Sequence, residues 1–229
     1  MNQKNRIRLA RERTLDQSDS LQRFWVIDPK ADDQSMSQPF SDLKSCQDSL
    51  LLPGKSNTYS STDSFTMLLV PLTGNIIIEE KKTGDIELGT LLFFKVSEGQ
   101  VFRLINPNKN TPVNFLLIEL IERGLNESRI LRFDNVANRL NETVCDNHKL
   151  SSYQYLKISM GEFKGRTDIN YYSPFLENDL FVLVLSGAFE VNDCLLSTRD
   201  ALSLVRTSQL EMESLSNNAF VLVLDINKS

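Results

Sequence analysis

Histidine and cysteine are scarce in this sequence of 229 residues, which contains one histidine and three cysteines. The histidine is His148, so a metal centre built from several imidazoles is excluded. The cysteines, Cys46, Cys145 and Cys194, are odd in number, far apart, and form no Cys-x-x-Cys pair. This spacing predicts neither a disulfide framework nor a structural zinc site. We expect the cysteines to be free thiols and His148 to be a surface residue.

Long apolar segments and an excess of positive charge are also missing. No apolar stretch approaches the roughly 18 to 20 residues needed to cross a bilayer, and residues 1–20 are polar where a signal peptide would be apolar. We therefore expect a cytoplasmic protein that does not engage membranes. The net charge of −5 disfavours direct binding to nucleic acid, because phosphate recognition needs a basic surface. The basic segment 4–13 alternates arginine with apolar residues, which predicts an edge strand in preference to a nucleic-acid-binding arm.

Short runs rich in Val, Ile, Leu and Phe are present throughout the chain and are separated by turn residues. This spacing is typical of β-sandwiches and barrels rather than of strands alternating with helices. Residues 82–85 predict a hairpin turn, with Gly84 at the position that requires positive φ. The predicted fold class is all-β, and the clearest strands are 67–72, 75–79, 91–96, 115–121, 180–185 and 219–226.

One order of strands and turns occurs twice along the chain. In each copy an apolar run ends at a glycine turn, Gly74 in the first and Gly187 in the second, and two further strands follow. The repeat predicts two barrels, which suits a chain of this length because domains commonly hold about 100 to 150 residues. We assign residues 1–121 to an N-terminal barrel that includes an N-terminal strand, 122–150 to a polar linker with a short helical turn, and 151–229 to a C-terminal barrel.

These segments resemble the pirin family, which includes bacterial pirin-like proteins and quercetinases. The resemblance extends from about Arg6 to the C-terminus and is carried by 39–43 and 52–54 before the first barrel, and by 182–192, 200–202 and 221–225 in the second. It implies a bicupin, with two jelly-roll (cupin, double-stranded β-helix) barrels in one chain.

The resemblance also locates a metal site at which this sequence lacks the usual ligands. Metal-binding pirins carry His-x-His and then an acidic residue in one segment, and His-x-Glu in another. Alignment on the neighbouring glycines and Phe65 puts other residues at all five positions: Ser60 and Thr62 at the first two histidines, Thr66 at the acidic residue, Phe102 at the third histidine and Leu104 at the glutamate. Hydroxyls are poor ligands for such metals, and phenylalanine and leucine have no lone pair to donate. We therefore expect no metal and no other cofactor.

Three classes of function follow. The first is binding of a small organic molecule, or a regulatory role, with the five positions above lining a pocket; its alternative is a barrel filled by side chains. The second is an enzyme, either a quercetinase-like dioxygenase or another cupin enzyme with an atypical site, which the resemblance alone suggests. No catalytic residues are predicted, because no phosphate loop, nucleophile elbow or Ser-His-Asp set is present. The third is a protein partner bound by Tyr171, Tyr172 and Phe175, unless these pack on the second barrel. The sequence permits a monomer or a homodimer.

Overall fold

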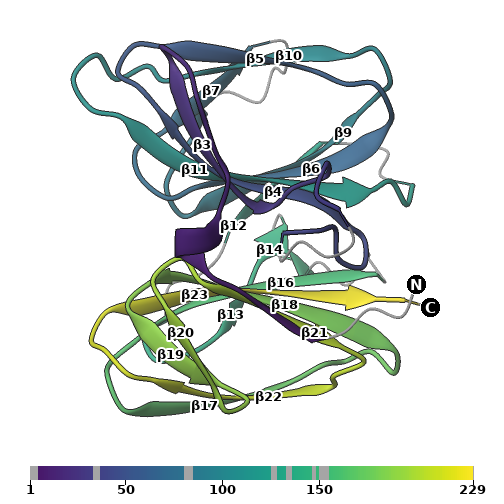
Figure 1. The fold of residues 1–229 in the computed structure, drawn as a ribbon, viewed down its shortest axis with the longest axis vertical. Helices are drawn as coiled ribbons and strands as arrows, with labels where there is room; N and C mark the ends of the chain where they lie inside the picture. Colours follow the sequence, from purple (N-terminus) through teal and green to yellow (C-terminus); the bar gives the residue numbers. More distant parts are fainter. Residues whose placement is uncertain are drawn as a thin grey trace. The chain divides into compact units, whose positions relative to one another are not determined.

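The computed structural model describes residues 5–32, 37–79, 85–124, 128–132, 136–145, 148–149 and 155–228. The fold is all-β, as predicted. Among these residues, helical structure is limited to one 3₁₀ turn, Ala10–Glu12 (η1). No helix in this part of the chain has the length and hydropathy that crossing a membrane requires. The chain divides into two compact units, residues 13–132 and residues 1–12 with 133–229 (Figure 1).

The first unit is made of antiparallel strands in two sheets. In chain order they are Leu15–Gln17 (β2), Leu21–Ile27 (β3), Leu43–Leu51 (β4), Ser56–Ser60 (β5), Phe65–Pro71 (β6), Ile76–Glu79 (β7), Asp85–Ile86 (β8), Thr90–Val96 (β9), Val101–Ile105 (β10), Val113–Ile121 (β11) and Arg129–Arg132 (β12). Within this unit one sheet has the order β12-β9-β6-β11-β4-β3-β2 and the other the order β5-β10-β7-β8. Apolar side chains from both sheets bury one another in a common core. This unit is the first jelly-roll barrel.

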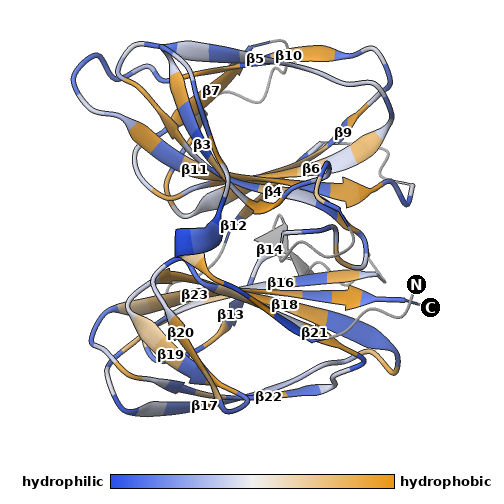
Figure 2. Ribbon diagram, in the orientation of Figure 1, coloured by the Kyte–Doolittle hydropathy of each residue, from blue (hydrophilic) through white to orange (hydrophobic). Residues whose placement is uncertain are grey.

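The second unit repeats this architecture. Its strands are Arg6–Arg8 (β1), Asn141–Glu142 (β13), Val144–Cys145 (β14), His148–Lys149 (β15), Leu156–Phe163 (β16), Thr167–Tyr172 (β17), Asn178–Ser186 (β18), Ala188–Val191 (β19), Cys194–Ser197 (β20), Ala201–Val205 (β21), Gln209–Ser214 (β22) and Ala219–Asn227 (β23). The sheets β1-β21-β18-β23-β16-β13 and β17-β22-β19-β20 enclose a second core, while β14 and β15 pair with each other. Hydrophobic residues are concentrated along the strands of both units (Figure 2).

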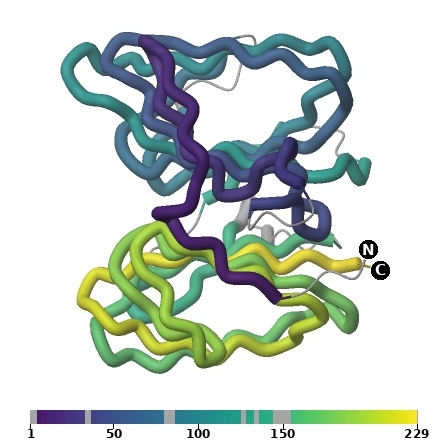
Figure 3. The backbone as a smooth tube through the Cα atoms, viewed as in Figure 1, coloured from purple at the N-terminus to yellow at the C-terminus, as the bar shows by residue number. Residues whose placement is uncertain are grey.

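The N-terminal strand belongs to the second unit and not, as the sequence assignment has it, to the first. β1 pairs antiparallel with β21, and the N-terminal segment runs beside the strands of the second unit (Figure 3). Ile7 lies opposite Leu202. β1 is an edge strand, as predicted, because it ends its sheet. Ile7 packs against the second core, and Arg8 is buried, with 3% exposure. β1 and β21 lie near opposite ends of the chain, and a pairing between such distant segments cannot be recognised from the local sequence pattern. The sequence analysis therefore assigns the N-terminal strand to the first barrel.

The polar segment 122–150 contains strands where a linker was expected. β12 pairs with β9 in the first unit, and β13 pairs with β16 in the second. Its described residues include no helical turn. Each of these strands lies at an edge within its unit, so it needs few apolar residues, which is why its composition indicates a linker.

Several local expectations concern turns and single residues. The hairpin predicted around residues 82–85 is supported by antiparallel pairing of β7 with β8, although residues 80–84 lie outside the described residues. Gly74 and Gly187 have φ of 66° and 76°, so the repeated glycine turns are confirmed. Neither Cys46 nor Cys194 forms a disulfide, as predicted. The expectations for the side chains of Cys145 and His148 fall outside the described part of the structure.

Candidate functional site in the first barrel

The two positions on β10 that the sequence assigns to the lost metal site lie in the interior of the first barrel. Phe102 and Leu104 are buried and belong to its core, whereas the intervening Arg103 points outward. This alternation follows from the period of two in a strand. The Phe102 ring meets the Phe94 ring edge to face, with centroids 5.6 Å apart. It also stacks on Tyr59, with centroids 5.1 Å apart and planes 7° apart.

Ser60 and Thr62 do not join this interior surface. Ser60 lies directly opposite Val101, which is 43% exposed, and residues directly opposite on paired strands share a face. Thr62 follows the end of β5 and is exposed. The β5 residue opposite Phe102 is Tyr59, so an aromatic side chain takes the inward position. The sequence does not indicate Tyr59, because β5 and β10 are far apart in the chain and their pairing register is set by the fold.

Thr66 is buried but faces away from the barrel interior. Its neighbours Phe65 and Met67 belong to the first core, so Thr66 points to the opposite side of β6. Its Oγ1 donates a hydrogen bond to Glu122 Oε2 at 3.0 Å. The five predicted positions are thus divided between the interior, the surface and the outer face of β6, and the structure does not gather them around one pocket.

The residues at the family's ligand positions do not fit a transition metal. The inward side chains there are Tyr59, Phe102 and Leu104, and two of these three have no lone pair that a metal could use. Within the described residues no group of three or more His, Cys, Asp and Glu side chains is arranged to hold a metal ion.

A row of polar residues faces the same interior from β4. Leu51 belongs to the core, and residues two apart on a strand share a face, so Ser49, Gln47 and Ser45 also point inward. Their exposures are 0%, 3% and 0%. The Oγ of Ser49 and the Oε1 of Gln47 have no hydrogen-bond partner among the described residues. Burial without a partner costs about 1–3 kcal/mol for each such group.

Aromatic and charged residues of β3 and β5 flank this row. Arg23 lies opposite Ser49, and Trp25 lies opposite Gln47. The guanidinium carbon of Arg23 is 5.3 Å from the Trp25 ring centroid and 5.5 Å from the Tyr59 ring centroid. Arg23 Nε and Tyr59 Oη are buried and make no hydrogen bond of acceptable geometry among the described residues. Burial raises the pKa of the Tyr59 hydroxyl, and the positive charge of Arg23 opposes that shift.

Glu119 of β11 completes the polar side of the barrel. It lies opposite Ser45 and shares a face with the core residue Leu117. Burial raises the pKa of its carboxyl group, and Asp63 adds to this shift. Ser45, Lys44 and Arg23 act in the opposite direction. The Ser45 hydroxyl is close enough to lower this pKa, yet it lacks hydrogen-bond geometry, so the clearest unpartnered groups are those of Gln47 and Ser49.

The polar row of β4 cannot be recognised from the sequence, because polar and apolar residues do not alternate regularly along Leu43–Leu51. Its polar residues suggest a partly solvated strand, whereas seven of its nine residues are buried. The family motif indicates Phe102 and Leu104 on β10, but the residues of β4 belong to no motif.

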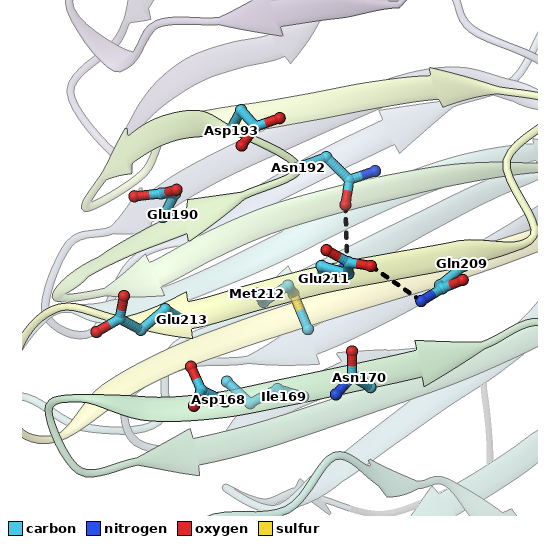
Figure 4. Close-up of a pocket in the computed structure, with 10 residues that line it drawn as sticks. All are labelled: Asp168, Ile169, Asn170, Glu190, Asn192, Asp193, Gln209, Glu211, Met212 and Glu213. Atoms are coloured by element: carbon cyan, nitrogen blue, oxygen red, sulfur yellow. Dashed lines mark hydrogen bonds between the residues drawn. The ribbon is translucent and has the colours of Figure 1, made fainter.

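The second unit has a separate acidic surface on the sheet formed by β17, β22 and β19. Glu213 lies opposite Asp168 on one side and Glu190 on the other (Figure 4). Arg166 Nη1 pairs with Glu213 Oε1 at 3.1 Å. Near these carboxylates, Asn192 Oδ1 accepts a hydrogen bond from the backbone N–H of Glu211. These like charges line an open pocket of about 650 Å³ (Figure 4).

The three aromatic residues predicted as a possible protein-binding surface do not lie on one face of the second barrel. Tyr171 is buried in the second core, and Tyr172 is 65% exposed. Phe175 is half-buried in the following turn. Packing on the second barrel therefore accounts for Tyr171.

Comparison with known proteins connects this geometry to a family. Residues 146–226 match the quercetinase C-terminal cupin domain. Escherichia coli YhhW has a similar structure, with a TM-score of 0.80 over 98% of each chain at 18% identity. The second barrel thus matches a quercetinase-type C-terminal cupin domain, and the whole chain has the bicupin fold of the pirins. The resemblance expected from the sequence is confirmed.

A second structure of YhhW and one of a quercetin dioxygenase share this bicupin fold. A structure of the bacterial pirin YhhW from E. coli in complex with nickel(II) matches with a TM-score of 0.76 and 16% identity, over 98% of this bicupin and 100% of that chain. Quercetin 2,3-dioxygenase from Acinetobacter baumannii matches with a TM-score of 0.73 and 12% identity, over 98% of this bicupin and 88% of that chain. Comparison with curated protein sequences finds no match.

Proposed function

We propose that this bicupin binds a small organic molecule inside its first barrel, on the polar row of β4, and that it does so without the metal of its family. The observation that carries the proposal is the pair of buried, unpartnered groups, Gln47 Oε1 and Ser49 Oγ. A ligand that satisfied both would offset their desolvation cost. Such a protein would act as a binding or regulatory module.

The lining defines the class of ligand. Gln47 Oε1 accepts hydrogen bonds only, Arg23 Nε donates only, and the Ser49 hydroxyl does both. Phe102 and Leu104 present an apolar surface on β10. The ligand therefore carries both donors and acceptors on one side and an apolar group on the other. Wholly apolar ligands would leave the polar row unsatisfied.

The decisive experiment compares Ser49→Ala with Ser203→Ala. Both serines are fully buried and have an unpartnered Oγ, but Ser203 lies in the second unit. Removing either unpartnered hydroxyl should raise stability by about 1 kcal/mol in the absence of ligand. Only Ser49→Ala should also abolish the thermal stabilisation produced by polar fragments that stabilise the wild type. If Ser49→Ala and Ser203→Ala respond equally to every such fragment, ligand binding at the β4 row is wrong.

The metal content of the purified bicupin tests the alternative of a quercetinase-like enzyme. We expect less than stoichiometric iron, copper, nickel, manganese and zinc by elemental analysis after gel filtration. One metal ion per chain that persists through purification would favour the enzyme and overturn the proposal. Only the family match and the similarity of fold support the enzyme alternative. The residues at the usual ligand positions argue against it, because they lack suitable metal-binding donors.

A further inference from the structure

The second barrel contains a pocket that is independent of the polar row in the first. Its volume is about 630 Å³. β13 ends one sheet of this unit and β17 ends the other, so the pocket opens at the seam where the two sheets part. Segment 136–142, β16 and β17 supply the lining.

β16 places a basic and a hydroxyl side chain in this pocket. Ser159 lies opposite Val223, a residue of the second core, so Ser159 and Lys157 face the barrel interior. Ser159 is 2% exposed and lines the pocket. It is therefore a largely buried polar group that is directed into the pocket.

Lys157 is held in place but keeps hydrogen-bonding capacity. Its Nζ lies 2.8 Å from Glu142 Oε1 and 5.0 Å from the centroid of the Tyr171 ring. An ammonium group has three N–H donors, so a single carboxylate partner leaves donors for a ligand. Lys157 and Ser159 are two residues apart on β16, so both present hydrogen-bond donors on the same face of the strand, and both line the pocket.

The polar groups next to Tyr171 already have hydrogen-bond partners within the protein. The Tyr171 hydroxyl donates to Asp225 Oδ2 at 2.6 Å, and Asn178 Nδ2 donates to Asp225 Oδ1 at 2.8 Å. Burial and the adjacent Asp225 carboxylate raise the pKa of Tyr171, so its hydroxyl stays protonated and remains the donor in this bond. A ligand therefore meets the Tyr171 ring and not its hydroxyl.

The charges around the pocket select a neutral ligand. Arg139 and Lys157 are basic, whereas Glu142 and Asp168 in the lining and the nearby Asp225 are acidic. A carboxylate ligand would be repelled by this excess of negative charge, and an ammonium ligand would place its donors against those of Lys157. A carboxamide avoids both conflicts, because its oxygen can accept from Lys157 and Ser159 while its nitrogen donates to Glu142.

We propose that this pocket binds a neutral small molecule whose carboxamide, or an equivalent donor and acceptor pair, contacts Lys157, Ser159 and Glu142. Leu140, Ile169 and the exposed face of Tyr172 supply an apolar wall for the rest of the molecule. The site goes beyond the function proposed for the first barrel and shares no residue with it.

The test uses three probes of matched shape and different charge: benzamide, benzoate and benzylamine. Each is titrated into the isotope-labelled full chain and followed by amide chemical shifts. We expect benzamide to bind saturably, with a Kd on the order of 1–10 mM for so few atoms. Its largest shifts should fall on residues 157–159 and 169–172. Benzoate and benzylamine should bind at least tenfold more weakly. Tighter binding of either charged probe would overturn the proposal.

Single substitutions test whether Ser159 and Lys157 contact benzamide. Ser159→Ala should weaken benzamide at least fivefold, and Lys157→Met should do the same, whereas Lys164→Met removes a lysine outside the lining and should have no effect. If Lys157→Met fails to fold, Ser159→Ala decides the question. An unchanged benzamide affinity in Ser159→Ala would refute the site. Ser49→Ala should leave benzamide binding intact, so failure of the first-barrel proposal and failure of this one are distinguishable.

Discussion

Tyr59 and Phe102 stack face to face inside the first barrel, with ring centroids 5.1 Å apart and planes 7° apart. They lie opposite each other on β5 and β10. The sequence alignment predicts a histidine ligand at the position of Phe102 in metal-binding pirins. In this protein the two stacked rings instead stabilise that wall of the barrel by packing against each other.

Replacing Phe102 by alanine should lower the free energy of unfolding of the first unit by about 3–5 kcal/mol, because it deletes a fully buried ring and leaves a cavity beside Tyr59 and Phe94. Urea unfolding followed by fluorescence measures this directly, since Trp25 is the only tryptophan of the chain and lies in this unit. Val101→Ala, at an exposed neighbour, should cost less than about 1 kcal/mol. Similar losses in both variants would mean that the ring is not part of a close-packed core.

The inward direction of Phe102 could be predicted from the sequence, but its stacking partner could not. The family motif and the period of two were enough to place Phe102 and Leu104 inside the barrel. Ser60 was expected beside them, and the pairing register brings Tyr59 there instead. A shift of one residue reverses the face of every side chain, and register is fixed by contacts distant in sequence.

Long-range pairing also explains the remaining differences. The strands of the two barrels and the turns at Gly74 and Gly187 are local features, and the sequence predicts them well. The partner of β1 lies almost 200 residues away along the chain, so no local pattern could reveal it. Gln47 and Ser49 carry polar side chains, and only the paired sheets on both sides of β4 show that these are buried.

Alanine substitutions at three turn glycines should differ in cost because the space around them differs. Gly99 has φ of 72° and open space beside it, so Gly99→Ala should cost about 1–2 kcal/mol from the backbone alone. At Gly187 an added Cβ would also lie 2.9 Å from Ala219 Cα, which cannot move without its strand, and roughly 3 kcal/mol or more is expected. Gly74 should be intermediate, because its added Cβ meets the Val113 side chain at 3.0 Å. Calorimetry of the three variants gives the order, and a smaller loss at Gly187 than at Gly99 would contradict it.

Glu119→Gln should become more stabilising, relative to the wild type, as the pH rises. Burial raises the pKa of the Glu119 carboxyl in the folded state. A raised folded-state pKa favours folding while the group is protonated, and this contribution is lost as the pH increases through the raised pKa. The difference in unfolding free energy between Glu119→Gln and wild type should therefore grow from about pH 4.3, the ordinary value for glutamate, and then level off above the folded-state pKa. Urea titrations at a series of pH values measure it.

The control for this pH dependence is Glu98→Gln, which removes a carboxylate from an exposed turn. Ser45, Lys44, Asp63 and Arg23 also influence the pKa of Glu119, so all four residues are kept unchanged in the variants that are compared. A difference that shrinks with rising pH would show that Glu119 gains more from Lys44 and Arg23 than it loses by burial.

Glu190→Gln should stabilise the second unit by roughly 0.5 kcal/mol at low salt. Glu190 and Asp168 lie directly opposite Glu213 on its two sides, and like charges directly opposite on paired strands are destabilising. Arg166 pairs with Glu213 but is itself highly exposed, so water screens much of its effect. Thermal unfolding at about 0.01 M and 1 M salt tests the origin of the gain, because the Debye length falls from about 30 Å to about 3 Å over that range. The gain should largely disappear at high salt, whereas Glu177→Gln, outside this row, should show little gain at either. A gain that persists in 1 M salt would locate the effect in strand packing instead of charge repulsion.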